Sequence, residues 1–213
     1  MSDLLTFLPG EMSGGAAYHM LNAIIAPRPI SWISTVSADG TPNLAPHSYT
    51  TVASPNPPIV MFTSVGRKDT LRNVEASGEF VYNVGSRALV ERINRTAADF
   101  PPEVNEFAWA GLTPLPGTLI KPPRVAEAPV QMECRLVEVR QVAQTSNYLV
   151  LGEVLAIHVD PAIMVDNRID PALLDPVGRL AGSAYATFGT VFKLERPTWA
   201  GLQEAGDKPM EPL

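Results

Sequence analysis

The sequence predicts a mainly β fold, a β-barrel with peripheral helices, and three observations support it. Short apolar, β-branched runs recur along the chain, only two or three segments have helical spacing, and 21 prolines interrupt helices. The 213 residues, of which 46% are hydrophobic and 18% charged, suffice for one substantial globular domain or at most two small ones. We expect an N-terminal arm over 1–17, one domain over 18–197 and a C-terminal tail over 198–213.

The strands are predicted from apolar runs that turn signals separate. A β-hairpin is expected around Asp39–Gly40, between the runs at 30–38 and 41–54. A continuous apolar run at 59–65 is typical of a strand that fills a barrel or sheet core. Further strands are expected at 79–85, 130–142, 147–159 and 187–197.

Three segments have the character of short helices. One is expected within 13–25, and another within 86–100, where apolar residues recur at helical spacing. Between them, the run DTLRNVEASG predicts a helix that Asp69 or Thr70 caps and that Gly78 ends.

Two segments are expected to lack regular structure. Residues 101–123 are rich in proline and predict a functional flap or a surface loop. The tail from Arg196 onward is polar and rich in proline and glycine, so a surface arm or a frayed end is expected.

Charge and cysteine content restrict the class of protein. A net charge of −6 and a pI near 5.1 argue against a general nucleic-acid binder. Cys134 is the only cysteine, so no internal disulfide can form, and its strand-like surroundings predict a packed or half-exposed thiol. The three histidines are not spaced as zinc ligands, and no metal centre is predicted. Without a signal peptide or a membrane-spanning apolar run, a cytoplasmic protein is expected.

A basic turn, SVGRKDTLRN at 64–73, precedes the predicted second helix. A helix N-terminus has unpaired N–H groups and the positive end of the helix dipole, so it favours a bound phosphate. Arg67 could bind phosphate oxygens bidentately, Lys68 could act as a point charge and Thr70 could donate a hydrogen bond. The alternative is a solvated helix start whose basic residues pair with Asp69 or Glu75. The glycine spacing of a Walker loop is missing.

Four stretches in order resemble one known family. They are the run from APRPISW to MFTS, the run GRKDTLRNVEASGEFVYNV, the strand GEVLAIHV and the run GRLAGSAYATFG, and they span roughly residues 20–197. Together they resemble the flavin reductase-like, FMN-binding split-barrel family, and PRPI is typical of one of its branches. The resemblance implies a six-stranded antiparallel Greek-key split barrel, a homodimer, and FMN bound without covalent attachment near the dimer interface.

The resemblance also implies a set of cofactor-binding residues. They are Ser34, Thr35, Asn43, Leu44 and Ala45 along the flavin ring, Ser48, Ser64, Arg67, Lys68 and Thr70 around the phosphate and ribityl chain, and Arg179 and Tyr185 near the pocket or the dimer partner. Ordinary strand composition is the alternative for the first two residues, turn chemistry for Asn43, and a turn into the last strand for the last two. Arg28 of PRPI is either a structural salt-bridge partner or reaches the cofactor across the dimer.

The sequence departs from the family pattern at the expected nicotinamide site. Many relatives have a histidine where this chain has Asn147, and asparagine cannot titrate near neutral pH. His47, close to the presumed flavin segment, is a second weak catalytic candidate.

The resemblance implies an oxidoreductase that passes electrons from NAD(P)H through FMN to flavin or another small-molecule acceptor. FAD is a possible resident flavin. The missing histidine keeps open a non-catalytic FMN-binding protein that stores the flavin or relays electrons from a protein partner. A third possibility is an oxidase or oxygenase component.

Overall fold

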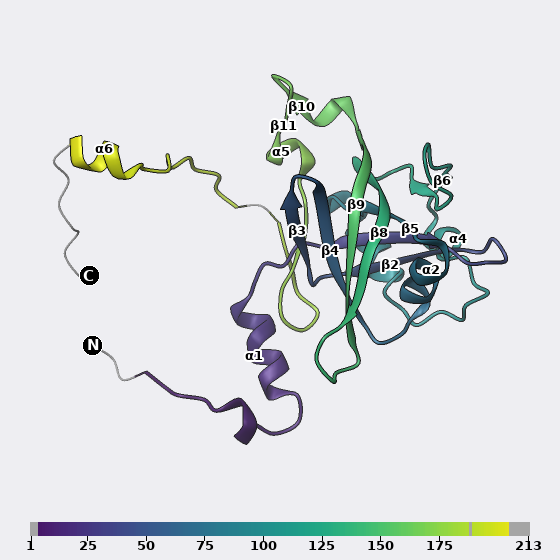
Figure 1. The fold of residues 1–213 in the computed structure, drawn as a ribbon, viewed down its shortest axis with the longest axis horizontal. Helices are drawn as coiled ribbons and strands as arrows, with labels where there is room; N and C mark the ends of the chain where they lie inside the picture. The colour runs from purple at the N-terminus through teal and green to yellow at the C-terminus, as the bar shows by residue number, and fades with distance from the viewer. Residues whose placement is uncertain (1–3, 188, 205–213) are drawn as a thin grey trace.

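One seven-stranded antiparallel sheet dominates a computed structural model of the chain, which describes residues 4–187 and 189–204 (Figure 1). Its strands are hydrogen-bonded in the order β2-β1-β5-β8-β9-β4-β3. They are β1 (Ser31–Val36), β2 (Pro42–His47), β3 (Thr50–Pro55), β4 (Pro58–Val65), β5 (Glu79–Val84), β8 (Val130–Gln141) and β9 (Asn147–Val159). Three two-stranded ribbons are formed by β6 (Pro114–Leu115) with β7 (Arg124–Val125), β10 (Met164–Val165) with β11 (Arg168–Ile169), and β12 (Gly178–Arg179) with β13 (Tyr185–Ala186).

The helices are short and lie outside the sheet. The α-helices are α1 (Ala16–Ile24), α2 (Asp69–Ser77), α3 (Val90–Arg95), α4 (Glu106–Ala110), α5 (Pro171–Leu174) and α6 (Trp199–Glu204), and three 3₁₀ turns span Pro9–Glu11, Arg87–Leu89 and Pro161–Ile163. The mainly β class and the barrel with peripheral helices are therefore confirmed, and so are the hairpin of β1 with β2 and the helix within 13–25.

The connection from β2 to β3 shows how the sheet closes. These strands stand at opposite ends of the hydrogen-bonding order, yet only Ser48 and Tyr49 join them. Two residues cannot cross a flat sheet of this width, so the sheet must curl until its two edges approach. The predicted single strand at 41–54 is thus two strands, and the expected count of six strands is one too low.

Both faces of β1 are buried, because strand side chains alternate between two separate cores. Ile33 points into the barrel with Phe62 and Phe80, and α2 adds Leu71 and Val74 to this core. Trp32 points to the other side, where it packs in a second core with residues of β2, α3 and α4. Cys134 is fully buried in the barrel core, and burial raises the pKa of its thiol to about 12, as expected for a packed thiol.

The predicted helix at 69–78 forms, but its N-terminus differs from the expectation. Gly78 ends it in the left-handed conformation with φ 71°, which glycine adopts without strain. The N-cap residue is Lys68, and it makes no side-chain capping bond. Asp69 is the first helical residue and Thr70 donates its hydroxyl to Asn43 instead, so the predicted cap is wrong. The helix expected within 86–100 is only a 3₁₀ turn followed by α3, and it ends at Arg95.

The segment 101–123 is not the surface flap that its prolines predicted. It contains α4, and Phe107, Ala110 and Leu112 are buried in the second core. Asn105 caps α4 by accepting from the backbone of Phe107 and Ala108. The run of prolines therefore marks irregular but packed structure.

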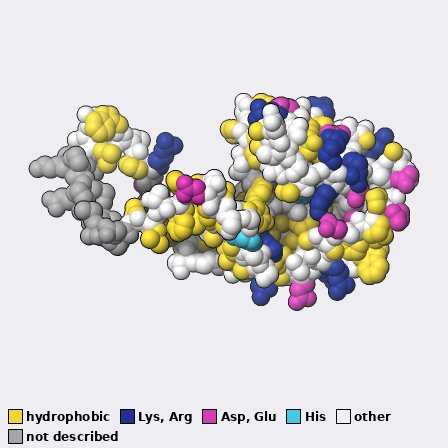
Figure 2. All heavy atoms as spheres, turned by 90° about the horizontal axis from the view of Figure 1, so that it is seen from below, with side chains coloured by type: hydrophobic (Ala, Val, Ile, Leu, Met, Phe, Trp, Pro, Cys, Tyr) yellow, Lys and Arg dark blue, Asp and Glu magenta, His cyan; other side chains and the backbone are white. Residues whose placement is uncertain are grey.

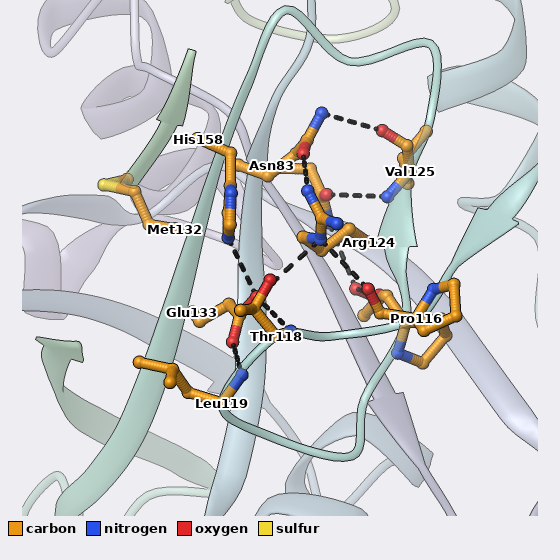
Figure 3. Close-up of polar contacts among 12 residues, drawn as sticks. Asn83, Pro116, Thr118, Leu119, Arg124, Val125, Met132, Glu133 and His158 are labelled. Atoms are coloured by element: carbon orange, nitrogen blue, oxygen red, sulfur yellow. Dashed lines mark hydrogen bonds and ion pairs between the residues drawn. The ribbon is translucent and has the colours of Figure 1, made fainter. Parts of the chain in front are cut away.

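A buried carboxylate holds the rest of this segment against the barrel (Figure 3). Glu133 of β8 accepts hydrogen bonds from the backbone N–H groups of Thr118 and Leu119, both at 2.7 Å, and contacts His158 Nε2 at 2.9 Å. Arg124 lies 3.7 Å from the same carboxylate. Burial favours a higher pKa for Glu133, but these donors outweigh it, and the carboxyl pKa lies below its usual value.

Both ends of the described chain extend away from the barrel (Figure 1). The strand predicted at 187–197 is not formed at residues 187 and 189–197, and α6 follows in the predicted tail. Hydrophobic side chains are frequent on these extensions (Figure 2), including Phe192 and Leu194, which are 81% and 88% exposed. The last residues of the predicted tail, 205–213, lie outside the described residues. Among the helices of the described ranges, none is long and apolar enough to cross a membrane.

Candidate functional site

The barrel closure and the start of α2 border a cavity of about 410 Å³, which we call the turn cavity. Its walls come from β2 and the Ser48–Tyr49 crossing, from Arg67–Thr70 with Arg72, from 96–100, and from Glu106. The cavity thus brings together six of the predicted cofactor-binding positions in its lining. These positions are Asn43, Ala45 and Ser48 on one wall and Arg67, Lys68 and Thr70 on the other, with Arg67 and Lys68 forming the predicted basic pair.

Each basic side chain of the turn already has an acidic partner. Arg67 pairs with Glu75, Arg72 pairs with Asp69, and Lys68 Nζ lies 2.6 Å from Asp99. The pairing that was the alternative interpretation of this turn is therefore present, and the same residues also line the cavity. All three cations have side chains more than half exposed, so these pairs are weak and open to exchange with a bound anion.

The start of α2 presents backbone donors to the same cavity. Gly66 has a φ of 86°, which lets the chain turn sharply between β4 and the helix. The N-cap Lys68 leaves the first-turn N–H groups without a side-chain acceptor. A helix start without a capping side chain, with three cations beside it, has the donors and the charge that an anion requires.

A buried polar network connects β2, α2 and α4 beneath the turn cavity. Asn43 donates to Glu106 at 2.8 Å and accepts from the hydroxyl groups of Thr70 at 3.0 Å and Thr35 at 3.2 Å. The backbone N–H of Leu44 donates to the other Glu106 oxygen at 3.2 Å. The network fixes the amide orientation of Asn43, because one end faces a carboxylate and the other faces hydroxyl donors.

Glu106 is the main residue of this site that sequence reasoning missed. It is only 5% exposed, and burial together with the nearby charge of Asp69 raises the pKa of its carboxyl, although Asn43 and Leu44 donate to it. The available signal was a single acid directly before the apolar residues of the run VNEFAW. Asp99 was missed as well, because only the folded chain places it beside Lys68.

His47 lines the turn cavity as a neutral ring. Nδ1 lies 3.3 Å from the carbonyl of Thr63, which can only accept, so this nitrogen carries the proton. Nε2 is buried and has no hydrogen-bond partner among the described residues. Burial lowers the pKa of the ring to about 4, with the charge of Lys68 adding to the shift.

Several predicted flavin-binding side chains do not line the turn cavity. Ser34 is fully buried and donates to the carbonyl of Pro123, and the Leu44 side chain belongs to the second core. Thr35 lies in the buried network, and Ser64 donates to the carbonyl of Gly66 at 2.8 Å. Strand alternation turns Ser34, Leu44 and Ser64 away from the cavity, whereas Thr35 lies behind Asn43 on the same side of the sheet.

Asn147, the other weak catalytic candidate, also lies elsewhere. It is the first residue of β9 and pairs with Val65, and its carbonyl accepts from Val142 at 2.9 Å. Asn147 thus lies in β9 directly after the turn that joins β8 to β9. Neither cavity described here has Asn147 in its lining.

Arg179 and Tyr185 line a second cavity of about 440 Å³, which we call the arginine cavity. Arg28 and residues of α1 form its other side. The two cavities are adjacent, since Tyr18, Pro46, Ser48 and Ala97 belong to both.

Arg28 was expected as a possible salt-bridge partner, but its guanidinium binds backbone carbonyls instead. Its guanidinium donates to the backbone carbonyls of Asn22 at 2.7 Å, Ile25 at 3.2 Å and Leu180 at 3.0 Å. It makes no ion pair within the described part of the chain, and it lies 5.8 Å from the ring centroid of Tyr49. Arg28 therefore holds the end of α1 against the segment after β12.

Comparisons with known proteins agree with this architecture. The sequence model of the flavin reductase like domain matches residues 25–173. A protein of Aquifex aeolicus is 38% identical over 187 residues, covering 85% of this chain and 94% of that protein. The crystal structure of nitrilotriacetate monooxygenase component B from Bacillus cereus is 35% identical, with a TM-score of 0.86 over 91% of this chain and all of that one.

A second solved structure is similar over nearly the same span. It is the 2-nitrobenzoate 2-nitroreductase NbaA of Pseudomonas fluorescens, which is 26% identical with a TM-score of 0.84 over 92% of this chain and 98% of that one. The matched domain covers more than half of the chain, and the barrel that carries both cavities is the shared structure. The chain belongs to the family of flavin reductase-like domains.

Proposed function

We propose that the chain is an FMN-binding oxidoreductase in which the turn cavity holds the flavin. The observation that carries this proposal is the meeting of the uncapped helix start, with Arg67, Lys68 and Arg72, and the small residues Ala45 and Ser48 of the strand crossing. The basic turn would hold the phosphate, and the crossing would border the ring. FAD, which has the same phosphate nearest the ring, is the second choice of flavin.

The residues of the turn cavity fit such a group. The start of α2 and Arg67, Lys68 and Arg72 supply donors and positive charge for a phosphate. The orphaned Nε2 of His47 is a buried acceptor in need of a donor. The flavin, when bound, supplies the hydride and electron chemistry, while the chain contributes binding, orientation and electrostatics.

The electron donor and acceptor are part of the proposal. We assign NADH or NADPH as donor and a flavin or another small molecule as acceptor, in line with family membership. The similarity to a monooxygenase component and to a nitroreductase supports small-molecule redox chemistry. One observation favours a second function, an FMN-binding relay reduced by a protein partner: Asn147 lies outside both cavities, and so gives no polar contact for a nicotinamide.

We also propose that the chain works as a homodimer. Leu21 and Ile24 of α1 and the following Ile25 are 58%, 69% and 63% exposed, and Phe192 and Leu194 on the C-terminal extension are more exposed still. A second copy covering these segments would bury apolar surface and close the open side of the cavities. Light scattering on the purified protein tests this, and a monomer that binds FMN tightly would contradict it.

The test of the proposed function is the visible spectrum of the purified protein, recorded anaerobically while NADH or NADPH is added. A flavin spectrum that bleaches within the mixing time supports the reductase and identifies its donor. A flavin spectrum that persists supports the relay. A colourless protein that cannot be reconstituted with FMN would contradict both.

A further inference from the structure

The arginine cavity carries positive charge without acidic residues in its lining. Arg28 and Arg179 both line it, and no aspartate or glutamate does so within the described ranges. The turn cavity, by contrast, is lined by Asp69, Asp99 and Glu106 alongside its cations. An excess of positive charge in one cavity is notable in a chain whose net charge is −6.

Arg28 is a buried cation that contacts backbone carbonyls and the ring of Tyr49 and has no carboxylate partner among the described residues. Arg28 is only 8% exposed, and its Nη atoms donate to backbone carbonyls. Its Nε is buried and has no hydrogen-bond partner in the described part of the chain. A buried guanidinium without a carboxylate retains an attraction for an anion that enters the cavity beside it.

Arg179 holds the second charge in a fixed position. Its guanidinium lies 4.5 Å from the ring centroid of Tyr185 and donates to the carbonyl of Gly182 at 2.6 Å. Tyr185 is held in turn, because its hydroxyl donates to Asn94 at 3.1 Å. One Nη of Arg179 is thus engaged, while the other N–H donors of its guanidinium make no hydrogen bond to the described residues. A planar oxyanion is the ligand that such a donor set fits.

The remaining walls of the arginine cavity combine apolar side chains with the polar residues His19, Asn22, Ser48 and Asn94. Ile30, Ile93, Pro46 and the rings of Tyr18 and Tyr185 line it. Small-molecule sites typically combine such walls with a few polar groups that orient the ligand. The cavity therefore suits a molecule with an apolar body and one anionic end.

We propose that the arginine cavity binds the carboxylate of a small organic substrate, with Arg179 as the contacting residue and Arg28 as the buried charge behind it. The shared wall with the turn cavity places the body of this molecule next to the proposed flavin site. The proposal rests on the proposed function only in calling the ligand a substrate. The anion site itself is inferred only from the charges of Arg28 and Arg179 and from the cavity that they line.

Benzoate and benzamide are the probes, because they share a ring and a shape and differ in charge. Each is titrated calorimetrically into the wild-type chain, Arg179→Gln, Arg179→Lys and Arg135→Gln. The last variant is the matched control, since Arg135 pairs with Glu153 on the barrel surface and is 62% exposed. FMN and riboflavin affinities are measured on the same four proteins.

Benzoate is expected to bind the wild type and Arg135→Gln equally. Its affinity should fall roughly tenfold or more in Arg179→Gln, because a charge-assisted contact is lost. Arg179→Lys should retain part of the affinity, and benzamide should bind all four proteins weakly. FMN affinity should be the same in the wild type and in Arg135→Gln.

Three results would overturn the proposal. They are no binding of benzoate to the wild type, equal binding of benzoate by wild type and Arg179→Gln, and equal binding of benzoate and benzamide. A loss of FMN affinity without a loss of riboflavin affinity in Arg179→Gln would assign the cavity to the flavin phosphate instead. Because the benzoate titration needs no flavin, a chain that fails to bind FMN can still confirm the anion site.

Discussion

The turn cavity and the arginine cavity share a wall but differ in how their cationic side chains are neutralised. In the turn cavity, exposed side chains form pairs between the helix start and nearby acids. In the arginine cavity, Arg28 is buried among backbone carbonyls and Arg179 lies over a tyrosine ring. The first arrangement lets an anion exchange with weak partners, and the second leaves charge that an anion would compensate. This difference is the basis for proposing two neighbouring sites that take different anions.

The largest expected effect tests the turn cavity. Arg67→Ala combined with Lys68→Ala should weaken FMN binding by about 2–4 kcal/mol, because two charge-assisted contacts to the phosphate are lost. Riboflavin, which has no phosphate, should bind nearly as before. Fluorescence titration of both flavins measures this, and an equal loss for both would refute the phosphate assignment.

The next effect concerns the pH dependence of stability near the same cavity. Folding lowers the pKa of His47 from 6.5 to about 4, so the unfolded chain takes up a proton first as the pH falls. Stability should be unaffected above pH 6.5 and should drop by about 3 kcal/mol between there and pH 4. In His47→Gln this part of the drop should be absent. Urea denaturation of both proteins across this range measures it, and parallel pH profiles would contradict it.

A smaller effect separates the two arginines of the arginine cavity. Arg28→Met should destabilise the fold by about 2 kcal/mol, because one buried and two partly buried carbonyls lose their donor. Arg179→Gln should change stability by less than about 0.5 kcal/mol, because its contacts are half-exposed. Thermal unfolding of both variants tests this, and an equally large loss for Arg179→Gln would give that residue a structural role.

The smallest expected effect concerns the buried network. Glu106→Gln should cost about 1 kcal/mol at pH 7.5, because an amide cannot accept from both Asn43 and Leu44. The pKa of Glu106 is raised, so the wild type gains stability as the pH falls through that pKa, and the gap to the variant should widen. This direction is opposite to that of His47. A gap that narrows at lower pH, measured by urea denaturation, would contradict it.

Local sequence signals predicted the elements that local physics controls. Apolar, β-branched runs separated by turn signals identified the strands β1, β4, β5, β8 and β9, and Gly78 was recognised as a helix end because a left-handed residue is needed there. The predictions failed where packing overrides composition. The prolines of 101–123 predicted a loop or flap. In the folded chain, Phe107 of this segment is buried in the second core, and Glu133 of β8 accepts a hydrogen bond from the backbone of Thr118. The strand expected at 187–197 has apolar residues but no partner strand among the described residues.

The amino-acid sequence alone determined the barrel class, the basic turn before α2 and, through resemblance, the family. Only the tertiary structure decided which side chains meet at the site. Ser48 reaches both cavities because the sheet curls, and Glu106 meets Asn43 across 63 positions of sequence. Arg28 contacts Leu180 across 152 positions. Contacts of this kind depend on how strands and loops pack in space, and they cannot be predicted from the periodicity of apolar residues along the chain.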